Sequence, residues 1–207
     1  MKKRRTLITS PLDWQMTDPS ALLRAGAPVR PPVLPVVAER GGTQLHAPKA
    51  TLIVDTREQN PFSFGRFRGW FAGVEHKALQ VGDYSIKGLE DVVTVERKDL
   101  PDLIHSFTTD RAGFVKRLRK MSGYPHRLLV VTAALSEVKS PYGGTSINPN
   151  RITQSLIAAL AGLGVPFVCS ETHELGAEIT ASYLYQVHLY HWLEANDYGR
   201  RLADEDL

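Results

Sequence analysis

The chain has 207 residues, and its 43% of apolar residues is enough to form the core of one ordinary globular domain. Its single cysteine, Cys169, excludes an intrachain disulfide and a metal site made of thiolates, and no stretch is apolar over the length that crosses a membrane. The formal net charge is +3. Because the chain has a single cysteine and no membrane-spanning stretch, we expect a soluble protein of a reducing compartment.

The first 48 residues are basic and rich in proline. Residues 1–50 contain eight lysines and arginines against three acidic residues, a net charge of +5, and seven of the thirteen prolines also fall there. That proline density opposes regular helices and strands. We therefore expect residues 1–48 to be an extended or disordered tail and residues 49–207 to be the folded domain. Such a tail either tethers the protein to a nucleic acid or a partner, or is a solvated segment without a specific role.

Strands and helices alternate from Thr51 onwards, which is typical of an α/β domain. Residues 70–79 are ambiguous between a helix and a loop that leads into a short strand. The expected strands cover residues 51–54, 81–87, 92–98, 127–132 and 166–170. The expected helices cover residues 99–107, 110–121, 150–163 and, as a long final helix, 171–194.

Several helix ends have recognisable caps. Asp99 is expected to cap the first helix, because its side chain can accept a main-chain N–H bond and the carboxylate of Asp102 follows in the first turn. Thr109 or Asp110 is expected to cap the second helix. Gly164 is expected to end the third.

A hairpin turn is expected at Gly88-Leu-Glu-Asp91. With the turn centred in that stretch, Lys87 faces Val92 and Asp83 faces Glu96. Directly opposite residues have Cβ atoms about 4.5–5.5 Å apart, and like charges at that distance are destabilising without a counterion. A divalent cation bound to Asp83 and Glu96 would remove that repulsion.

Side chains alternate along each strand, so the hairpin has one polar and one apolar face. Asp83, Glu96 and Lys98 share the polar face, and Arg97 points away from it. The opposite face is apolar and carries Tyr84, Ile86, Val93 and Val95. The polar face is therefore the expected working face.

This polar face has the groups that a hard cation and a phosphodiester require. Mg²⁺ prefers oxygen ligands and keeps several waters, which suits Asp83 and Glu96, with Asp55 at the end of the first strand as a third carboxylate. Lys98 is placed to orient or activate a water or to stabilise charge on a phosphate, and Arg57 to bind a phosphate. In isolation, the same charges are also typical of a solvated strand edge or an ion-pair network.

Three separated motifs follow one another in a specific order. Gly82-Asp83 precedes Glu96-Arg97-Lys98 and, three residues later, Asp102. This matches the GD…ERKxxxD signature of the XPF-type structure-specific endonucleases, the excision-repair nuclease family. Upstream, Val54-Asp-Thr-Arg-Glu58 is similar to the V-D-x-R-E element of that family. The chain resembles this family from about residue 52 to the final helix.

The resemblance implies a restriction-endonuclease-like α/β fold, with a central mixed sheet flanked by helices, that cuts branched, flapped or forked DNA with Mg²⁺ or Mn²⁺. By position, Asp55, Asp83 and Glu96 would hold the metal. Lys98 would serve the attacking water. The residues that would support the site are Arg57, Glu58, Arg97 and Asp102, the last of which equally suits a helix start.

Positive charge gathers on the expected helix 110–121, soon after the motif. Its basic residues are Arg111, Lys116, Arg117, Arg119 and Lys120. They are placed either to contact DNA phosphates or to form a solvated helix face. The expected DNA-binding residues are Arg57, Arg111, Lys116, Arg117 and Lys120.

Family members often carry a tandem helix-hairpin-helix module after the nuclease domain and sometimes a helicase domain before it. This sequence ends at Leu207 without room for such a module, and no helicase domain precedes the motifs. We therefore expect either a self-contained nuclease, as a homodimer through its last helices, or a nuclease subunit that a partner protein recruits.

The sequence thus predicts a Mg²⁺-dependent endodeoxyribonuclease of DNA repair or recombination, located in the cytoplasm, at a nucleoid or in a nucleus. A rival from another class is a non-catalytic DNA-binding or scaffold subunit, against which the intact Asp83, Glu96 and Lys98 argue. A second rival is a Holliday-junction resolvase or a phage-type recombination nuclease. The motifs do not separate these last enzymes from one another.

Overall fold

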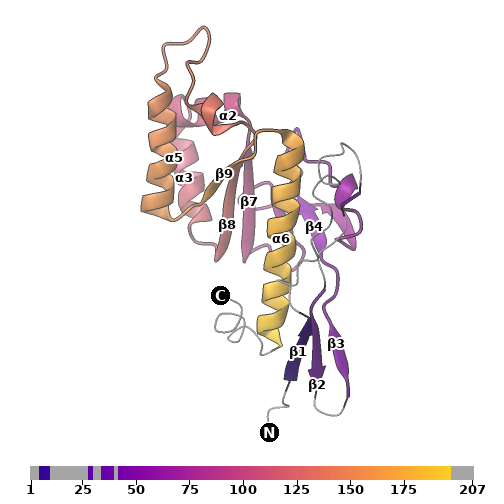
Figure 1. The fold of residues 1–207 in the computed structure, drawn as a ribbon. Coiled ribbons are helices and arrows are strands. Elements are labelled where there is room, and N and C mark those ends of the chain that lie inside the picture. The colour runs from indigo at the N-terminus through magenta and orange to yellow at the C-terminus, as the bar shows by residue number, and fades with distance from the viewer. Residues whose placement is uncertain (1–4, 10–27, 30–33, 40–41, 197–207) are drawn as a thin grey trace. The chain divides into compact units, whose positions relative to one another are not determined.

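The computed structural model describes residues 5–9, 28–29, 34–39 and 42–196 (Figure 1). The chain divides into two compact units. Unit 1 comprises residues 1–51, 64–74 and 181–207, and unit 2 comprises residues 52–63 and 75–180. All residues of the predicted site belong to unit 2.

Unit 2 is built on a six-stranded sheet. Its strands are β4 (Thr51–Val54), β5 (Gly73–His76), β6 (Tyr84–Ile86), β7 (Val93–Lys98), β8 (His126–Val131) and β9 (Phe167–Cys169). The strand order is β5-β4-β6-β7-β8-β9. β4, β6 and β7 pair antiparallel, whereas β7, β8 and β9 pair parallel. The sheet is therefore mixed, as predicted, and β7 is the strand at which the pairing changes direction.

The hairpin of β6 and β7 has the predicted register. Tyr84 pairs with Val95, and this pairing places Asp83 opposite Glu96. Tyr84 and Val95 are fully buried, as expected for the apolar face. The connection between the strands turns through Gly88, whose φ of 82° is favourable only for glycine.

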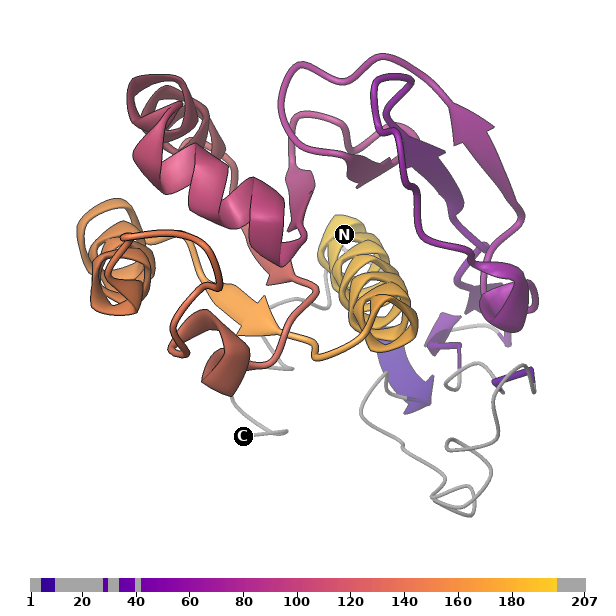
Figure 2. The ribbon, with the colours of Figure 1, turned by 90° about the horizontal axis from the view of Figure 1, so that it is seen from above.

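Helices account for most of the remainder of unit 2 and continue into unit 1. They are α2 (Leu100–Thr108), α3 (Arg111–Met121), α4 (Leu135–Val138), α5 (Pro149–Leu163) and α6 (His173–Ala195). Within unit 2, α2, α3 and α5 lie together on one side of strands β7, β8 and β9 (Figures 1 and 2). Parallel strands need such crossover connections, because a short turn cannot bring the chain back to the same end of the sheet.

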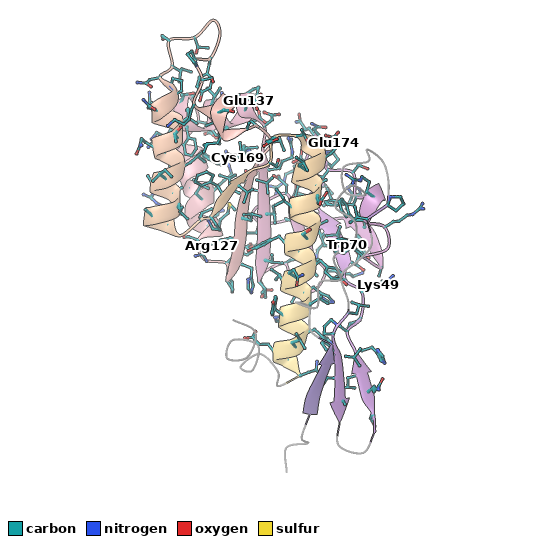
Figure 3. The ribbon with its side chains drawn as sticks, in the orientation of Figure 1. Lys49, Trp70, Arg127, Glu137, Cys169 and Glu174 are labelled. Atoms are coloured by element: carbon teal, nitrogen blue, oxygen red, sulfur yellow. The ribbon has the colours of Figure 1, made fainter. Side chains whose placement is uncertain are left out.

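The caps confirm most of the expected helix ends. The Asp99 side chain accepts a hydrogen bond from the Asp102 N–H and so begins α2. Gly164 ends α5 with a φ of 60°, and its carbonyl accepts a bond from Nε of Arg127, labelled in Figure 3. Asp110 stands at the N-cap of α3, one of the two expected positions, but its side chain makes no capping hydrogen bond and pairs with Arg117 at 2.9 Å instead.

The apolar faces of α2, α3 and α5 form one core with the sheet. Phe107 of α2 and Phe114 of α3 meet edge to face, with ring centroids 5.0 Å apart. Leu129 and Val131 of β8 are buried against the same cluster. Full burial of one such side chain contributes about 2–3 kcal/mol, so this core fixes α3 to the sheet beside β7.

Unit 1 contains regular structure in the stretch that proline density led us to expect as extended or disordered. A three-stranded antiparallel sheet is formed by β1 (Arg5–Thr9), β2 (Val36–Glu39) and β3 (Gln44–His46), in that order. The strands use the segments between the prolines, so local composition was a poor guide to pairing between them. Residues 1–4, 10–27, 30–33 and 40–41 lie outside the described residues. The domain boundary at residue 48 stays a prediction.

Unit 1 also has its own apolar contacts. Val37 is packed against Leu193 in one cluster. Trp70, labelled in Figure 3, follows the short 3₁₀ helix η1 (Gly65–Phe67) and meets Tyr185 edge to face, with ring centroids 5.1 Å apart. In residues 70–79, where a helix or a loop before a strand was expected, the structure has the second alternative, since β5 begins at residue 73. Among the described residues, no helix combines the length and apolarity needed to span a membrane.

Candidate active site

Asp83 and Glu96 meet where three strands are joined by main-chain hydrogen bonds. The Asp83 N–H donates to the Val95 carbonyl at 2.7 Å, and the Asp83 carbonyl accepts from the Asp55 N–H at 2.8 Å. The Asp83 carboxylate is held in turn by the Arg97 N–H, which donates to its Oδ2 at 2.7 Å. Glu96 lies on β7 and is 4% exposed. The Asp83 carboxylate is therefore held by the backbone and half-buried, and Glu96 is almost fully buried.

Gly82 is the residue that allows Asp83 to occupy this place. Its φ is 80°, and a Cβ atom there would lie 2.1 Å from Oγ1 of Thr94 and 2.9 Å from the Val95 carbonyl oxygen. The Thr94 hydroxyl donates to the Val81 carbonyl at 2.8 Å and so ties this segment to β7. Any side chain at residue 82 would push the segment away from the strand and would move Asp83 with it.

The carboxylates of Asp83 and Glu96 repel each other, and this repulsion changes the pKa of Asp83. Burial, and then the negative charge of Glu96, raise the pKa of Asp83 to about 8. At neutral pH the pair therefore retains a proton on Asp83 unless a positive charge replaces it. A carboxylate pair held in this state is the arrangement that a divalent cation stabilises most.

Lys98 supplies the nearest positive charge. Its Nζ lies 3.0 Å from Oε1 of Glu96, and its side chain is 16% exposed. The same ammonium lies 5.7 Å from the centre of the Phe114 ring, within the range of a cation–π contact. Lys98 is thus held between the carboxylate pair and α3, on the face predicted from strand alternation.

Asp55 lies close by but has different partners. Its carboxylate accepts hydrogen bonds from the N–H of Arg57, from both Nε and Nη2 of the Arg57 guanidinium, and from the N–H of Leu79. Burial alone would raise the pKa of Asp55, but the bonds from Arg57 and Leu79 hold that pKa below its ordinary value. Asp55 is therefore an ionised carboxylate whose two oxygens are already bonded.

Glu58 and Arg97 form a second pair, outside the cavity. Nη2 of Arg97 lies 3.0 Å from Oε1 of Glu58, and each side chain is 5% exposed. Burial would raise the pKa of Glu58, but the hydrogen bonds from Arg97 and from the Asn60 N–H, together with the charges of Arg97 and Lys98, keep that pKa below its ordinary value. Arg97 points away from the carboxylate pair, as predicted, and its Nη1 is buried without a hydrogen-bond partner among the described residues. Its main-chain N–H, however, holds Asp83.

The site residues surround a cavity of about 450 Å³. One part of its wall comes from the strands and the segment before β6, and another part comes from α3. Its lining consists of Asp55, Arg57, Gln80, Val81, Gly82, Asp83, Glu96, Lys98, Gly113, Lys116, Arg117 and Lys120. All four residues predicted as catalytic, and four of the five predicted to contact DNA, therefore face one space.

Several predicted residues lie elsewhere. Nη1 of Arg111 donates to the Ser155 hydroxyl of α5 at 2.9 Å, and Arg111 does not line the cavity. Asp102 is exposed in the first turn of α2, also outside the lining, which favours its reading as a helix-start residue. Glu58 and Arg97 are outside the lining as well. Arg97 contacts the site through its main-chain N–H, which donates to Asp83.

Three residues of the cavity lining were not predicted. Gln80 and Val81 lie just before the Gly-Asp motif, and Gly113 lies in the first turns of α3. Phe114 carries both Lys98 and Arg117 over its ring, the latter with Cζ 5.4 Å from the centre. The sequence of α3 alone does not predict these contacts, because the distance between α3 and β7 depends on how the core of unit 2 packs.

The donor set at the cavity fits a hard divalent cation in part. Asp83 and Glu96 offer carboxylate oxygens, and Mg²⁺ is commonly held by one or two carboxylates plus waters and phosphate oxygens. Among the described residues, no group of three or more His, Cys, Asp or Glu is arranged to hold a metal ion. The predicted three-carboxylate site stays a prediction, and both oxygens of Asp55 already accept hydrogen bonds from Arg57 and Leu79.

The cavity lies in the part of the chain that matches a known protein family. The model of a protein family, the ERCC4 domain, matches residues 54–183, which include every residue of the cavity lining. No curated protein matches the chain. Among solved structures, XPF from Aeropyrum pernix has a TM-score of 0.53 and 21% identity, over 74% of this chain and 67% of that one. A second structure of XPF from Aeropyrum pernix, in complex with DNA, has a TM-score of 0.52 and 20% identity, over 67% of this chain and 64% of that one.

At these identities the structural likeness concerns the fold. It confirms an XPF nuclease-like arrangement, with a mixed sheet flanked by helices. The chain spans about two thirds of the length of each of these structures.

Proposed function

Because the chain belongs to the ERCC4-domain family, we propose that it is a metal-dependent endonuclease that hydrolyses phosphodiester bonds in DNA. The observation that carries this proposal is the pairing of Asp83 with Glu96, two opposed and shielded carboxylates in a cavity that four basic side chains also line besides Lys98. The acids suit a cation, and the bases suit a polyanion. The phosphodiester backbone of a nucleic acid is a substrate that engages both, and the ERCC4-domain family favours DNA.

The chain's own residues would divide the work as follows. Asp83 and Glu96 would hold Mg²⁺ or Mn²⁺, which when bound activates a water and neutralises charge that develops on the phosphate. Lys98, 3.0 Å from Glu96, keeps a positive charge beside the pair and orients the attacking water. The exposed Lys116 and Lys120 attract and position the DNA backbone along α3.

The first test is cleavage by the purified full chain with Mg²⁺, using Glu96→Gln and Asp83→Asn as the inactivating variants. Either substitution removes a cation ligand, so the cleavage rate should fall by about three orders of magnitude, since metal catalysis is worth several kcal/mol. Glu75→Gln is the matched control, because Glu75 is an exposed carboxylate paired with Lys87 outside the cavity. Cleavage by Glu96→Gln at the rate of Glu75→Gln would remove the proposal.

For the substrate, we propose branched, flapped or forked DNA in repair or recombination. The same assay on single-stranded, flap, fork and four-way substrates would distinguish this from a resolvase, which should prefer the four-way form. We further propose that the chain acts either as a homodimer or with a recruiting partner protein. Cleavage that appears only after such a partner is added would favour the subunit alternative, and binding without cleavage under all conditions would favour a DNA-binding scaffold.

A further inference from the structure

Asp55 differs from Asp83 and Glu96 because each of its two carboxylate oxygens accepts two hydrogen bonds from the chain. It is 2% exposed, and its Oδ1 accepts from the main-chain N–H of Arg57 at 2.7 Å and from Nε at 2.8 Å. Its Oδ2 accepts from Nη2 of Arg57 at 2.8 Å and from the N–H of Leu79 at 2.6 Å. A cation at Asp55 would have to displace donors that already neutralise and solvate it.

Two of those donors belong to the backbone, and one of them, the N–H of Leu79, connects Asp55 to a separate segment. Asp55 follows β4, while Leu79 lies four residues before Asp83 in the segment that leads into β6. Nη2 of Arg57 also donates to the Leu79 carbonyl. The carboxylate of Asp55 and the guanidinium of Arg57 therefore bridge the two segments together.

Arg57 is oriented by this bridge and still has donors to offer. Nε and Nη2 are used, whereas Nη1 has no hydrogen-bond partner in the part of the chain that the structure describes. The Arg57 side chain is 67% exposed and lines the cavity with Asp83 and Glu96. A planar guanidinium fixed on one edge by a carboxylate presents its other edge in a defined direction, which suits a phosphate oxygen.

We propose that Asp55 is a positioning residue that holds the Arg57 guanidinium at the cavity for a DNA phosphate, and that the cation is bound by Asp83 and Glu96 without Asp55. This inference rests on the proposed function. It assigns Asp55 a role different from that of the third metal ligand expected from the sequence.

The first experiment measures Mn²⁺ binding to the full chain by calorimetry, without DNA. Arg57→Lys keeps the positive charge but lacks the planar fork that bonds both oxygens of Asp55. If Asp55 is a positioning residue, Arg57→Lys should bind Mn²⁺ with the affinity of the wild-type chain, whereas Glu96→Gln should lose binding. Tighter Mn²⁺ binding by Arg57→Lys would show that Asp55 is a cation ligand masked by the arginine fork, and would overturn the inference.

The second experiment is a double-mutant cycle on DNA affinity with Asp55→Asn and Arg57→Ala, in EDTA so that no cation takes part. Loss of one charge-assisted hydrogen bond should weaken binding about tenfold to a hundredfold for Arg57→Ala. Asp55→Asn should weaken binding in the same direction, and the double variant should be no weaker than Arg57→Ala, because Asp55 acts through Arg57. Additive losses would contradict the positioning role, and Arg57→Lys should not restore affinity, because lysine lacks the planar fork.

The two experiments separate this inference from the proposed function. If the wild-type chain binds no Mn²⁺ and cuts no DNA, the proposed function fails, while the cycle in EDTA still decides whether Asp55 and Arg57 act together. Thermal unfolding of each variant identifies loss of fold. Should Asp55→Asn not fold, the Mn²⁺ affinity of Arg57→Lys, which keeps the charge, still decides whether Asp55 is a ligand.

Discussion

The surroundings of Asp83 destabilise its ionised form, which is typical of a functional residue. A carboxyl group beside Glu96, with limited access to solvent, has its pKa raised from 3.8 to about 8. The surrounding hydrogen bonds do not remove this cost, because the Arg97 N–H is one donor against a full negative charge across the hairpin. Residues that violate ordinary stability rules in this way are concentrated at functional sites.

The pKa of Asp83 leads to a prediction about stability and pH without metal. Because the folded chain holds the Asp83 proton up to about pH 8 and the unfolded chain releases it near 3.8, the folded state binds more protons between these values. The free energy of unfolding should therefore fall as the pH rises through this window, by on the order of a few kcal/mol, and level off above it.

Urea unfolding in EDTA across that pH range would measure this slope. Asp83→Asn cannot ionise, so it should flatten the dependence and should be more stable than the wild-type chain at pH 8. Asp102→Asn is the control, because Asp102 is exposed and outside the cavity. An unchanged slope in Asp83→Asn would mean that Asp83 does not carry the proton.

Gly82 and Gly88 provide a second prediction at this scale, because they share a backbone conformation but not their surroundings. Their φ angles are 80° and 82°, so alanine is strained at both. A Cβ at residue 82 meets Oγ1 of Thr94 at 2.1 Å, whereas one at residue 88 has nothing within 4 Å. Gly88→Ala should cost about 1 kcal/mol and Gly82→Ala about 2–4 kcal/mol, since the latter adds overpacking to the same strain.

Chemical denaturation of the two variants would give this difference directly. Gly82→Ala should also weaken Mn²⁺ binding, because Asp83 follows the altered residue, and Gly88→Ala should not. Equal destabilisation of both variants would indicate that the segment before β6 can move away from β7 without cost.

At the scale of elements, α3 is expected to be the part of the molecule that contacts the DNA backbone near the cavity. Lys116 and Lys120 are exposed and line the cavity, whereas Arg119 is exposed on the same helix and does not. Lys116→Ala and Lys120→Ala should each lower DNA affinity and reduce the slope of log affinity against log salt by about one, as expected for one phosphate contact. Arg119→Ala is the matched control.

Fluorescence anisotropy at several salt concentrations would test this prediction. The comparison is strict because each variant removes one positive charge from one helix. If Arg119→Ala reduces affinity and slope as much as Lys116→Ala, the contribution of α3 is a general attraction and not a contact at the cavity.

The elements also show which parts of the site were predictable from sequence. The opposition of Asp83 and Glu96 followed from a short hairpin, in which register is set by the turn and by alternation alone. The bond between Arg111 and Ser155 spans 44 residues and depends on how α3 packs against α5, which no local pattern contains. The bond between Asp55 and Arg57 was also hidden, because these residues lie beyond the end of β4, where strand alternation no longer applies.

At the scale of the whole molecule, the charge excess lies in the first 50 residues, which carry +5 of a chain whose total is +3. That stretch is more than a bare tail, because β1, β2 and β3 fall within it and Val37 packs against Leu193 in unit 1. Deletion of residues 1–48 would therefore remove structure together with charge. The effect of the charge on DNA has to be tested by substitution.

Lys2, Lys3 and Arg4 precede β1 in the sequence, so replacing all three with glutamine changes no residue of β1, β2 or β3. If they contact phosphates, the triple variant should bind DNA more weakly at low salt, with a salt slope smaller by about two to three. Cleavage at saturating DNA should be unchanged, since these residues lie outside the sequence of the cavity lining.

A control variant with Lys77, Lys87 and Lys139 replaced by glutamine removes the same charge from exposed positions. Equal affinities of the two variants at every salt concentration would show that only net charge matters, and an unaltered affinity of the first would show that the basic start of the chain takes no part in binding.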